Sequence, residues 1–543
     1  MPISTYVQIA LYALAAAGMT AASTHLVHIL QLEGYKNKNL KRWMGANRSR
    51  VFVLPMAASA FGLLLALICN LVFIKQPMAY LVSGVVLSLV YLAAMLLYAK
   101  ARRIKNAKKP LVMTSRVKRL FVAIAVVYAL VCGALWALDA FVLYGTVLFG
   151  LALFALLLLV AIGVMVANSL ASPVEKAVQR WFLNDARRIL AERDDLIKIG
   201  ITGSYGKTSC KFILGTILSE RYDVLVPPSS YNTPMGVTRV VREQLKNSHE
   251  VMIAEMGARN VGDIRELCEL VKPQFGLLTS VGPQHLETFG TIENIAKTKY
   301  ELIEGLPAHG CAFFPADNEI CRGLYNKTNI EKYLFAVEYE GSAEARAENV
   351  RCGSFGSRFE LVIGGERIEC ETRLLGKHNI ANIVGCACVA HRLGLTPTQI
   401  RIGIRKIQPV EHRLQLLPTS GGVAVIDDAF NANPSGVRAA MEVLSGFEGR
   451  KIVVTPGMVE LGDKEAEENR AFGKVMAGVA DIVFLIGPKH TKPIYDGLME
   501  AKFSHDAVRV FGSLSEASEE LWKLARPGDV VIFENDLPDN YNE

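Results

Sequence analysis

The chain has 543 residues, enough for three or four domains of roughly 150 residues each. Its net charge of +7 is modest, and no aromatic interleaving or basic fold motif accompanies the basic residues, so we expect no nucleic-acid partner. The ten cysteines contain no CxxC pair, which argues against a zinc site or a disulfide framework and favours reduced thiols facing a cytoplasm. Hydrophobic residues make up 51% of the chain, and their excess lies before about residue 170, which indicates a membrane part followed by a soluble part.

Five apolar runs in the first part are long enough to cross a bilayer, which requires about 20 residues each. None contains Lys, Arg, Asp or Glu, and they cover approximately residues 6–30, 51–73, 79–98, 120–138 and 142–168. The first run lacks a basic start and is too long for the core of a cleavable signal peptide. The sequence therefore predicts a membrane α-helical bundle of about five helices over residues 1–170.

The loops between these runs differ in charge. Segments 36–50 and 100–119 are rich in Lys and Arg, whereas the alternate loops hold little more than Lys75 and Asp139. Because basic loops stay in the cytoplasm, we expect a multi-pass protein of the plasma or inner membrane, with its N-terminus outside and its soluble part cytoplasmic. His25 and His28, near the inner end of the first run, are either interfacial polar residues or a contact for a proton or a head group.

Residues 171–197 are expected to form an amphipathic linker helix that begins at Ser172-Pro173, since Ser is a common N-cap and Pro fits the first turn. Val174 and Trp181 belong to its apolar face. That face would either lie on the membrane surface or pack against the soluble part, and the pattern favours neither.

A short apolar strand at 197–201 leads into a glycine turn and then into a helical run that ends at Leu218. Strand, glycine turn and helix form the context of a phosphate loop, in which backbone N–H groups and the helix N-terminus hold an anion. Lys207 would bridge the β- and γ-phosphates of ATP, and the Thr208 hydroxyl would bind Mg²⁺. The loop is a variant, because the usual spacing places a glycine at Ile201. The expected nucleotide contacts are Gly203, Ser204, Gly206, Lys207, Thr208 and Ser209.

This variant, Gly-Ser-Tyr-Gly-Lys-Thr-Ser, resembles the ATP loop of the Mur ligase family, and further motifs follow in the family's order through most of residues 198–543. The nearest branch is MurF-like and adds D-alanyl-D-alanine to a muropeptide. The resemblance implies an α/β fold: a central P-loop-type ATPase domain with a mostly parallel sheet at 198–415, and a C-terminal Rossmann-like domain at 416–543. It also implies an ADP-forming carboxylate–amine ligase that uses ATP and Mg²⁺.

The same resemblance implies residues for two Mg²⁺ ions. Glu255, in Ala-Glu-Met-Gly-Ala, matches a metal-binding acidic residue after a strand, and His285 matches the ligand of the second ion. Lys299 matches a lysine that is commonly carbamylated by CO₂. Lys297 is the neighbour most easily confused with it, and the helix phase together with the following Tyr-Glu favours Lys299.

Other motifs imply contacts to the nucleotide. Asn379 and Asn382, in Gly-Lys-His-Asn-Ile-Ala-Asn, lie three residues apart on one helical face and match residues that contact adenine or phosphate. Arg413 matches an arginine that stabilises charge on the transferred phosphoryl group. Asp428 would accept from the ribose hydroxyls and Asn431 would approach the phosphates. The family's Ser-Tyr pair is replaced by Ala-Phe at 429–430, so two hydroxyl groups are missing there.

The implied reaction has two steps: an acceptor carboxylate attacks the γ-phosphate to form an acyl-phosphate, and an amine then displaces phosphate. Asn232 and Thr233 match a segment near the acceptor and are candidates for positioning its carboxylate. Lys207, His285, Lys299 and Arg413 form the expected catalytic set.

Both ends of the chain differ from the family. Membrane runs replace the domain that holds the UDP-sugar in soluble relatives, so we expect a lipid-linked or cell-envelope acceptor, in contact with the lipid bilayer, and an amino acid or small amine as partners. Near the C-terminus an acidic segment at 533–539 replaces a Lys-Gly-Ser turn and either selects a basic nucleophile or is a solvated tail. Two other functions remain open: a membrane ligase that makes a poly-amino-acid or capsule-like polymer, and a catalytically silent, ATP-gated membrane scaffold.

Overall fold

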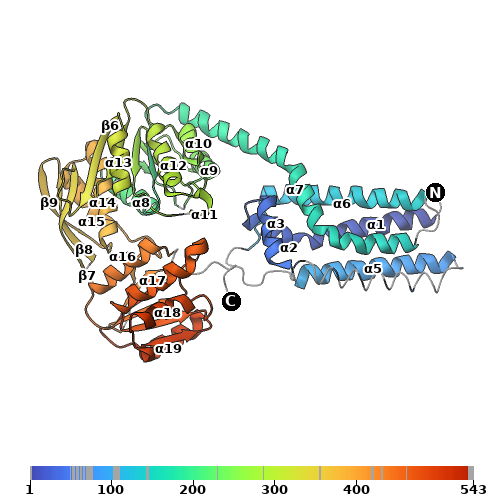
Figure 1. Ribbon diagram of the computed structural model, residues 1–543. Helices are drawn as coiled ribbons and strands as arrows, with labels where there is room; N and C mark the ends of the chain where they lie inside the picture. Colours follow the sequence, from blue (N-terminus) through green and yellow to red (C-terminus); the bar gives the residue numbers. More distant parts are fainter. Residues whose placement is uncertain are drawn as a thin grey trace. The chain divides into compact units, whose positions relative to one another are not determined.

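The computed structural model describes residues 3–48, 51, 56, 60, 64, 68, 77–101, 110–141, 146–228, 230–284, 286–353, 356–417, 421–429, 432–459 and 461–535. The chain divides into two compact units, Met1–Arg180 and Trp181–Glu543 (Figure 1). Three sequence predictions lie wholly or largely outside the described residues: the apolar run at 51–73, His285 and Asn431.

The first unit is built from helices around one apolar core, and α1 packs against both α5 and α6. Two of its described segments are long and apolar enough to cross a membrane: Tyr12–Leu32, which is 61% buried within the unit, and Ser115–Ala137, which is only 22% buried. Because apolar surface that the protein leaves unburied is unfavourable in water, the second segment is the stronger candidate. The helices are α1 (Ile3–Ala22), α2 (Thr24–Leu32), α3 (Asn37–Ala46), α5 (Pro77–Ala101), α6 (Ser115–Phe141) and α7 (Thr146–Ala191).

Helix α7 differs from its sequence prediction. It runs unbroken over 46 residues with Pro173 inside it, so the expected helix start at Ser172-Pro173 is wrong. A proline removes one backbone hydrogen bond, and the long helical run before it continues despite that loss. At the end of α7, Ala186 and Leu190 are buried in the core of the second unit, so this part packs against the soluble fold.

A nine-stranded sheet, here called the central sheet, forms the first half of the second unit. Its strand order is β2-β3-β1-β4-β5-β6-β7-β8-β9, with parallel pairing from β2 to β7 and antiparallel pairing from β7 to β9. The strands are β1 (Ile197–Thr202), β2 (Val224–Leu225), β3 (Val251–Glu255), β4 (Phe275–Leu278), β5 (Cys311–Pro315), β6 (Glu331–Val337), β7 (Ala345–Gly353), β8 (Gly356–Ile363) and β9 (Glu366–Thr372).

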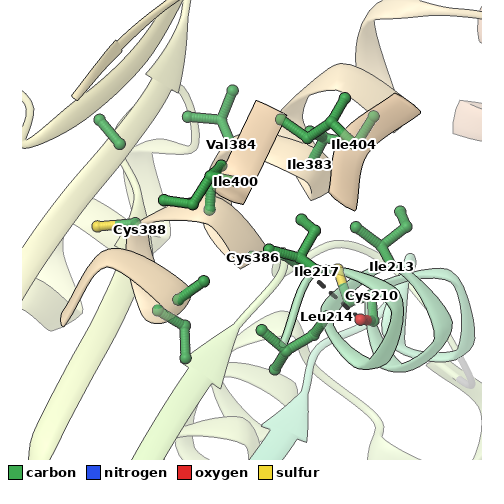
Figure 2. Close-up of a cluster of buried hydrophobic side chains, with 14 of the residues drawn as sticks. Cys210, Ile213, Leu214, Ile217, Ile383, Val384, Cys386, Cys388, Ile400 and Ile404 are labelled. Atoms are coloured by element: carbon green, nitrogen blue, oxygen red, sulfur yellow. Dashed lines mark hydrogen bonds between the residues drawn. The ribbon is translucent and has the colours of Figure 1, made fainter. Parts of the chain in front are cut away.

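Helices cover both faces of the central sheet. One core joins α8, α14 and α15, where Ile213, Ile383 and Ile404 are among the buried side chains (Figure 2). The other core joins the end of α7 to α9, α10, α12 and α13. The helices of this half are α8 (Lys207–Leu218), α9 (Pro234–Gln244), α10 (Asp263–Val271), α11 (Leu286–Phe289), α12 (Ile292–Glu304), α13 (Glu319–Lys327), α14 (Lys377–Arg392) and α15 (Pro397–Lys406).

A six-stranded sheet, the C-terminal sheet, follows with the order β10-β11-β15-β12-β13-β14 and with only β10 antiparallel to its neighbour. The strands are apolar runs bounded by turns, as buried parallel strands require. The elements are β10 (Gln415–Leu417), β11 (Ala424–Asp428), α16 (Pro434–Ser445), β12 (Lys451–Thr455), α17 (Glu465–Ala477), β13 (Ile482–Ile486), α18 (Lys492–Glu500), β14 (Val508–Phe511), α19 (Leu514–Leu524) and β15 (Val530–Glu534). The mostly parallel α/β architecture is thus the one the sequence predicts.

Candidate active site

The carboxyl ends of three neighbouring parallel strands, β3, β1 and β4, meet at one edge of the central sheet. Open α/β sheets bind their ligands at this edge, beyond the ends of the strands. The glycine turn 203–206 follows β1, Glu255 is the last residue of β3, and Thr279 directly follows β4. Segments far apart in the sequence therefore bring their side chains to one place.

The turn after β1 is held in shape by the segment that follows β4. The Ser204 hydroxyl donates to the carbonyl oxygen of Gly282 at 2.9 Å and accepts the Gly282 N–H at 3.0 Å. The Thr279 hydroxyl donates to the carbonyl oxygen of Tyr205 at 2.5 Å. These contacts fix the conformation of the turn without a ligand.

Gly206 ends the turn and caps α8. Its φ of 81° lies in the left-handed region, which a residue with a side chain adopts only with strain. A Cβ on Gly206 would also lie 2.6 Å from Asn382 Oδ1, so α14 approaches the turn closely. Asn382 accepts a hydrogen bond from the Cys210 thiol at 3.2 Å, which fixes the amide beside the turn.

Lys207 folds back over the turn at the start of α8. Its Nζ donates to the carbonyl oxygens of Gly203 at 2.6 Å and Ser204 at 3.1 Å. Burial lowers the pKa of Lys207 to about 8, and the negative charge of Glu255 partly opposes that shift. Ser209 is buried in the same first turn of the helix. Glycine turn, helix N-terminus and lysine together fit the triphosphate of a nucleotide.

Glu255 lies almost completely buried, with 1% of its surface exposed. Its Oε1 accepts hydrogen bonds from the Thr208 hydroxyl at 3.1 Å and from Asn232 Nδ2 at 3.0 Å. Its Oε2 lies 3.3 Å from Nζ of Lys211. A carboxylate and a hydroxyl oxygen side by side are the hard donors that Mg²⁺ prefers, so Glu255 and Thr208 fit the metal implied by the sequence.

Lys211 was missed by the sequence analysis, although a signal for it exists. It lies four residues after Lys207, which places both lysines on one face of α8. A fully buried lysine is rare unless it is paired, so a lysine next to the apolar residues Cys210, Ile213 and Leu214 predicts a buried carboxylate partner.

Lys299, on α12, is 2% exposed, whereas Lys297 is exposed to solvent. Burial, aided by the positive charge of Lys207, lowers the pKa of Lys299 to about 7. The negative charges of Asp263 and Glu301 oppose that shift. About half of the Lys299 amines are therefore neutral near pH 7, and Lys299 lies close enough to Lys207 for the two charges to interact.

Glu301, two residues after Lys299, accepts hydrogen bonds at the start of a helix. It is buried and accepts the N–H groups of Gly262 at 2.8 Å and Arg265 at 3.0 Å, at the start of α10. A carboxylate is favourable at a helix N-terminus, so this contact locks α12 to α10 and orients Lys299 two residues earlier.

Of the remaining asparagine and threonine candidates, two lie at the site and two are hydrogen-bonded to nearby backbone groups. Asn232 touches Glu255, but the Thr233 hydroxyl accepts the N–H of Gly236 at 3.2 Å and serves as the N-cap of α9. Asn382 lies at the glycine turn, but buried Asn379 donates to the carbonyl oxygen of Leu375 at 2.8 Å. Thr233 and Asn379 thus have structural partners within four residues in the sequence.

Arg413 and Asp428 come from the C-terminal sheet region. The backbone N–H of Leu414 donates to Asp428 Oδ1 at 3.0 Å. Burial lowers the pKa of Arg413, while the negative charges of Asp428 and Glu255 act in the opposite direction. The charge of Arg413 also acts on Lys207, so the arginine lies within electrostatic reach of the glycine turn.

The acidic segment near the C-terminus begins inside the fold. Glu534 is 1% exposed and lies directly opposite Asp428 in the parallel pairing of β15 with β11. Burial raises the pKa of Asp428 to about 6 and, reinforced by the charge of Asp428, raises the pKa of Glu534 well above its usual value. Glu534 is therefore not part of a solvated tail, and residues 536–539 lie outside the described residues.

Two family models match this chain: the Mur ligase middle domain over residues 201–390, and the Mur ligase, glutamate ligase domain over residues 412–534. The UDP-N-acetylmuramoyl-tripeptide–D-alanyl-D-alanine ligase of Mycobacterium tuberculosis (strain ATCC 25618 / H37Rv) is 31% identical over 355 residues, which cover 62% of this chain and 69% of that protein. The Bacillus subtilis (strain 168) ligase of the same name is 28% identical over 339 residues, with 62% and 72% covered.

Solved structures agree in fold. MurF from Acinetobacter baumannii matches with a TM-score of 0.60 and 24% identity, covering 67% of this chain and 78% of that one. MurF ligase from Thermotoga maritima in complex with ADP matches with a TM-score of 0.59 and 24% identity, covering 66% and 80%. The chain belongs to the Mur ligase family. It is an ADP-forming, ATP-dependent amide ligase that uses Mg²⁺.

Proposed function

We propose that this ligase joins a carboxylate on a membrane-linked or cell-envelope precursor to an amino acid or small amine, through an acyl-phosphate. The observation that carries the proposal is the coexistence of two parts in one chain. The family match begins at residue 201, and a separate helical unit precedes it, in which Ser115–Ala137 is apolar and only 22% buried. A bilayer would cover that helix and hold the ligase part at the cytoplasmic face of the cell membrane.

The site residues support assigned roles in this reaction. Lys207 and Arg413 would neutralise charge on the transferred phosphoryl group, and Thr208 with Glu255 would hold one Mg²⁺. Asn232, which already touches Glu255, would position the acceptor carboxylate beside the metal.

His285 and Lys299 would organise a second Mg²⁺. Neutral Lys299 would attack CO₂ through its amine nitrogen, forming an N–C bond as one C=O π bond opens to a C–O⁻ group and releasing one proton to water, so that the neutral amine becomes a carbamate anion. The burial of Lys299 and its pKa of about 7 support this step, because the neutral amine is the form that reacts.

The test is ADP release by the detergent-purified full chain with Mg²⁺ and bicarbonate. Lipid-linked envelope precursors, or the soluble UDP-muramoyl tripeptide, are supplied with and without a panel of amino acids, D-alanyl-D-alanine and small amines. We expect ADP only when a lipid-linked acceptor and one amine are both present, and none from Lys207→Ala. Amine-dependent ADP release with the soluble UDP-muramoyl tripeptide as the only acceptor would contradict the membrane-linked part of the proposal. Repeated addition to its own product would indicate a polymer-forming ligase instead.

A further inference from the structure

Lys211 is a charged residue beside Glu255 that has no role in the proposed reaction. Lys211 is fully buried in α8, and its Nζ lies 3.3 Å from Glu255 Oε2 and 4.5 Å from the centre of the Phe212 ring. Removing both charges from water is costly, and a buried ion pair seldom adds net stability. The pairing of Lys211 with Glu255 is therefore expected to have a role other than stability.

The two oxygens of Glu255 face different partners. Oε1 receives the Thr208 hydroxyl and the Asn232 amide, and Oε2 faces the Lys211 ammonium group. In this arrangement the two oxygen donors of the candidate metal site are hydrogen-bonded to each other. The single negative charge of Glu255 is already balanced by Lys211.

The surrounding groups add further positive charge. Lys207 and Arg413 both interact electrostatically with Glu255, and Asp428 also acts on Arg413. Among the described residues, three cationic side chains, those of Lys207, Lys211 and Arg413, therefore act on the single carboxylate of Glu255. A divalent cation entering alone meets net repulsion. A nucleotide triphosphate brings enough negative charge to reverse that balance.

We propose that Lys211 is a positioning residue that holds Glu255 and suppresses metal binding until the nucleotide arrives, so that Mg²⁺ enters with the phosphates. This inference rests on the proposed role of Glu255 as a metal ligand. It makes Lys211 the fixed counter-charge of that ligand, set into the helix that also carries Lys207 and Thr208.

The experiment measures Mn²⁺ binding to the full chain by electron paramagnetic resonance of free Mn²⁺, with and without ADP. Lys211→Met should bind Mn²⁺ in the absence of ADP at least tenfold more tightly than the wild type. Lys211→Arg keeps the charge and should match the wild type. Lys198→Met is the matched control, because Lys198 is also buried but lies near the start of β1, where its Nζ donates to the carbonyl oxygen of Leu190 at 3.4 Å.

Lys211→Gln provides a second neutral variant in case Lys211→Met does not fold, and ADP binding without metal verifies the fold of each. Wild-type Mn²⁺ affinity in a folded neutral variant would overturn the inference. The gain should vanish in Lys211→Met combined with Glu255→Gln. If Glu255→Gln alone leaves Mn²⁺ binding in the presence of ADP unchanged, the proposed metal-ligand role of Glu255 fails, and the inference about Lys211 fails with it. If Glu255→Gln loses Mn²⁺ binding but Lys211→Met shows no gain in Mn²⁺ affinity, only the inference about Lys211 fails.

Discussion

Three lysines of the site region show how position sets the chemistry of a side chain. Lys207 folds over backbone carbonyls, and Lys211 pairs with Glu255. Lys299 is buried, and its pKa of about 7 lies below that of Lys207, about 8. The same kind of amine thus donates to backbone carbonyls, balances a carboxylate or loses part of its charge near pH 7, depending on its burial and on which charges lie nearby.

Lys299 and Lys297 form a natural pair for mutation, because one is buried and the other exposed on the same helix. Lys299→Ala should lower the ligase rate by about 100-fold, since it removes the group that becomes the carbamate. Lys297→Ala should retain nearly full activity. The check is ADP release with and without added bicarbonate; a bicarbonate-independent wild type, or equal losses in the two variants, would contradict the carbamylation proposal.

The substitution Gly206→Ala tests whether the glycine turn binds the phosphates of the nucleotide. Gly206→Ala places a Cβ in the left-handed region and 2.6 Å from Asn382 Oδ1, a cost of about 1–2 kcal/mol from the backbone alone. We expect ADP affinity to fall by roughly tenfold, measured by calorimetric titration. Gly323→Ala is the control, because that glycine lies within α13 and no atom comes within 4 Å of the added Cβ. Unchanged ADP affinity in Gly206→Ala would argue against a phosphate contact at this turn.

At the scale of elements, strand pairing creates chemistry that no single strand contains. Asp428 ends β11, Glu534 ends β15 more than a hundred residues later, and parallel pairing sets them side by side. Likewise β1, β3 and β4 combine a glycine turn, an acid and a threonine at one edge of the central sheet. The elements themselves are readable in the sequence, whereas their adjacency is not.

Glu534→Gln tests the carboxyl pair through the pH dependence of stability. The folded-state pKa of Glu534 is raised, so above the unfolded pKa of about 4.3 the unfolded chain releases a proton that the folded chain keeps. Wild-type stability therefore falls as the pH rises, and Gln removes this loss. We expect Glu534→Gln to be more stable than the wild type at pH 8 and nearly equal to it at pH 4. Denaturant unfolding at both pH values provides the measurement, and a destabilised variant at pH 8 would refute the raised pKa.

At the scale of the whole molecule, two units of different character share one chain. The first has an apolar helical segment of which only 22% is buried, and the second is an α/β ligase fold with cores on both faces of each sheet. Two of the five expected spans have a described helical segment that is long and apolar enough, and the five-span topology itself stays a prediction.

Val126→Arg tests whether α6 lies in a bilayer, because Val126 is exposed on that helix. A charge in the hydrocarbon costs about 2.5–3.5 kcal/mol, so we expect less of the chain in the alkali-washed membrane fraction. Val510→Arg is the matched control, because Val510 is a similarly exposed valine on β14 of the ligase fold. Release of the unmodified chain by alkaline washing would contradict membrane integration.

Local patterns in the sequence determined the glycine turn between β1 and α8, the mostly parallel α/β elements, the apolar helices and the family. Each depends on neighbours within a few residues: glycine before Lys207, apolar alternation, or runs of uncharged residues. Helix phase also favoured Lys299 over Lys297, and the burial of Lys299 agrees with that choice. The carbamylation of Lys299 stays a proposal.

Only the tertiary structure decided which charges meet. Lys211 and Glu255, or Asp428 and Glu534, lie on separate elements, and the register that joins them depends on packing across the whole sheet. The structure also carried α7 through Pro173, because a long helical run outweighed the local signal. Thr233 and Asn379, by contrast, bond to backbone groups only three and four residues away. Electrostatic energies depend on distance in space and on burial, and sequence separation specifies neither.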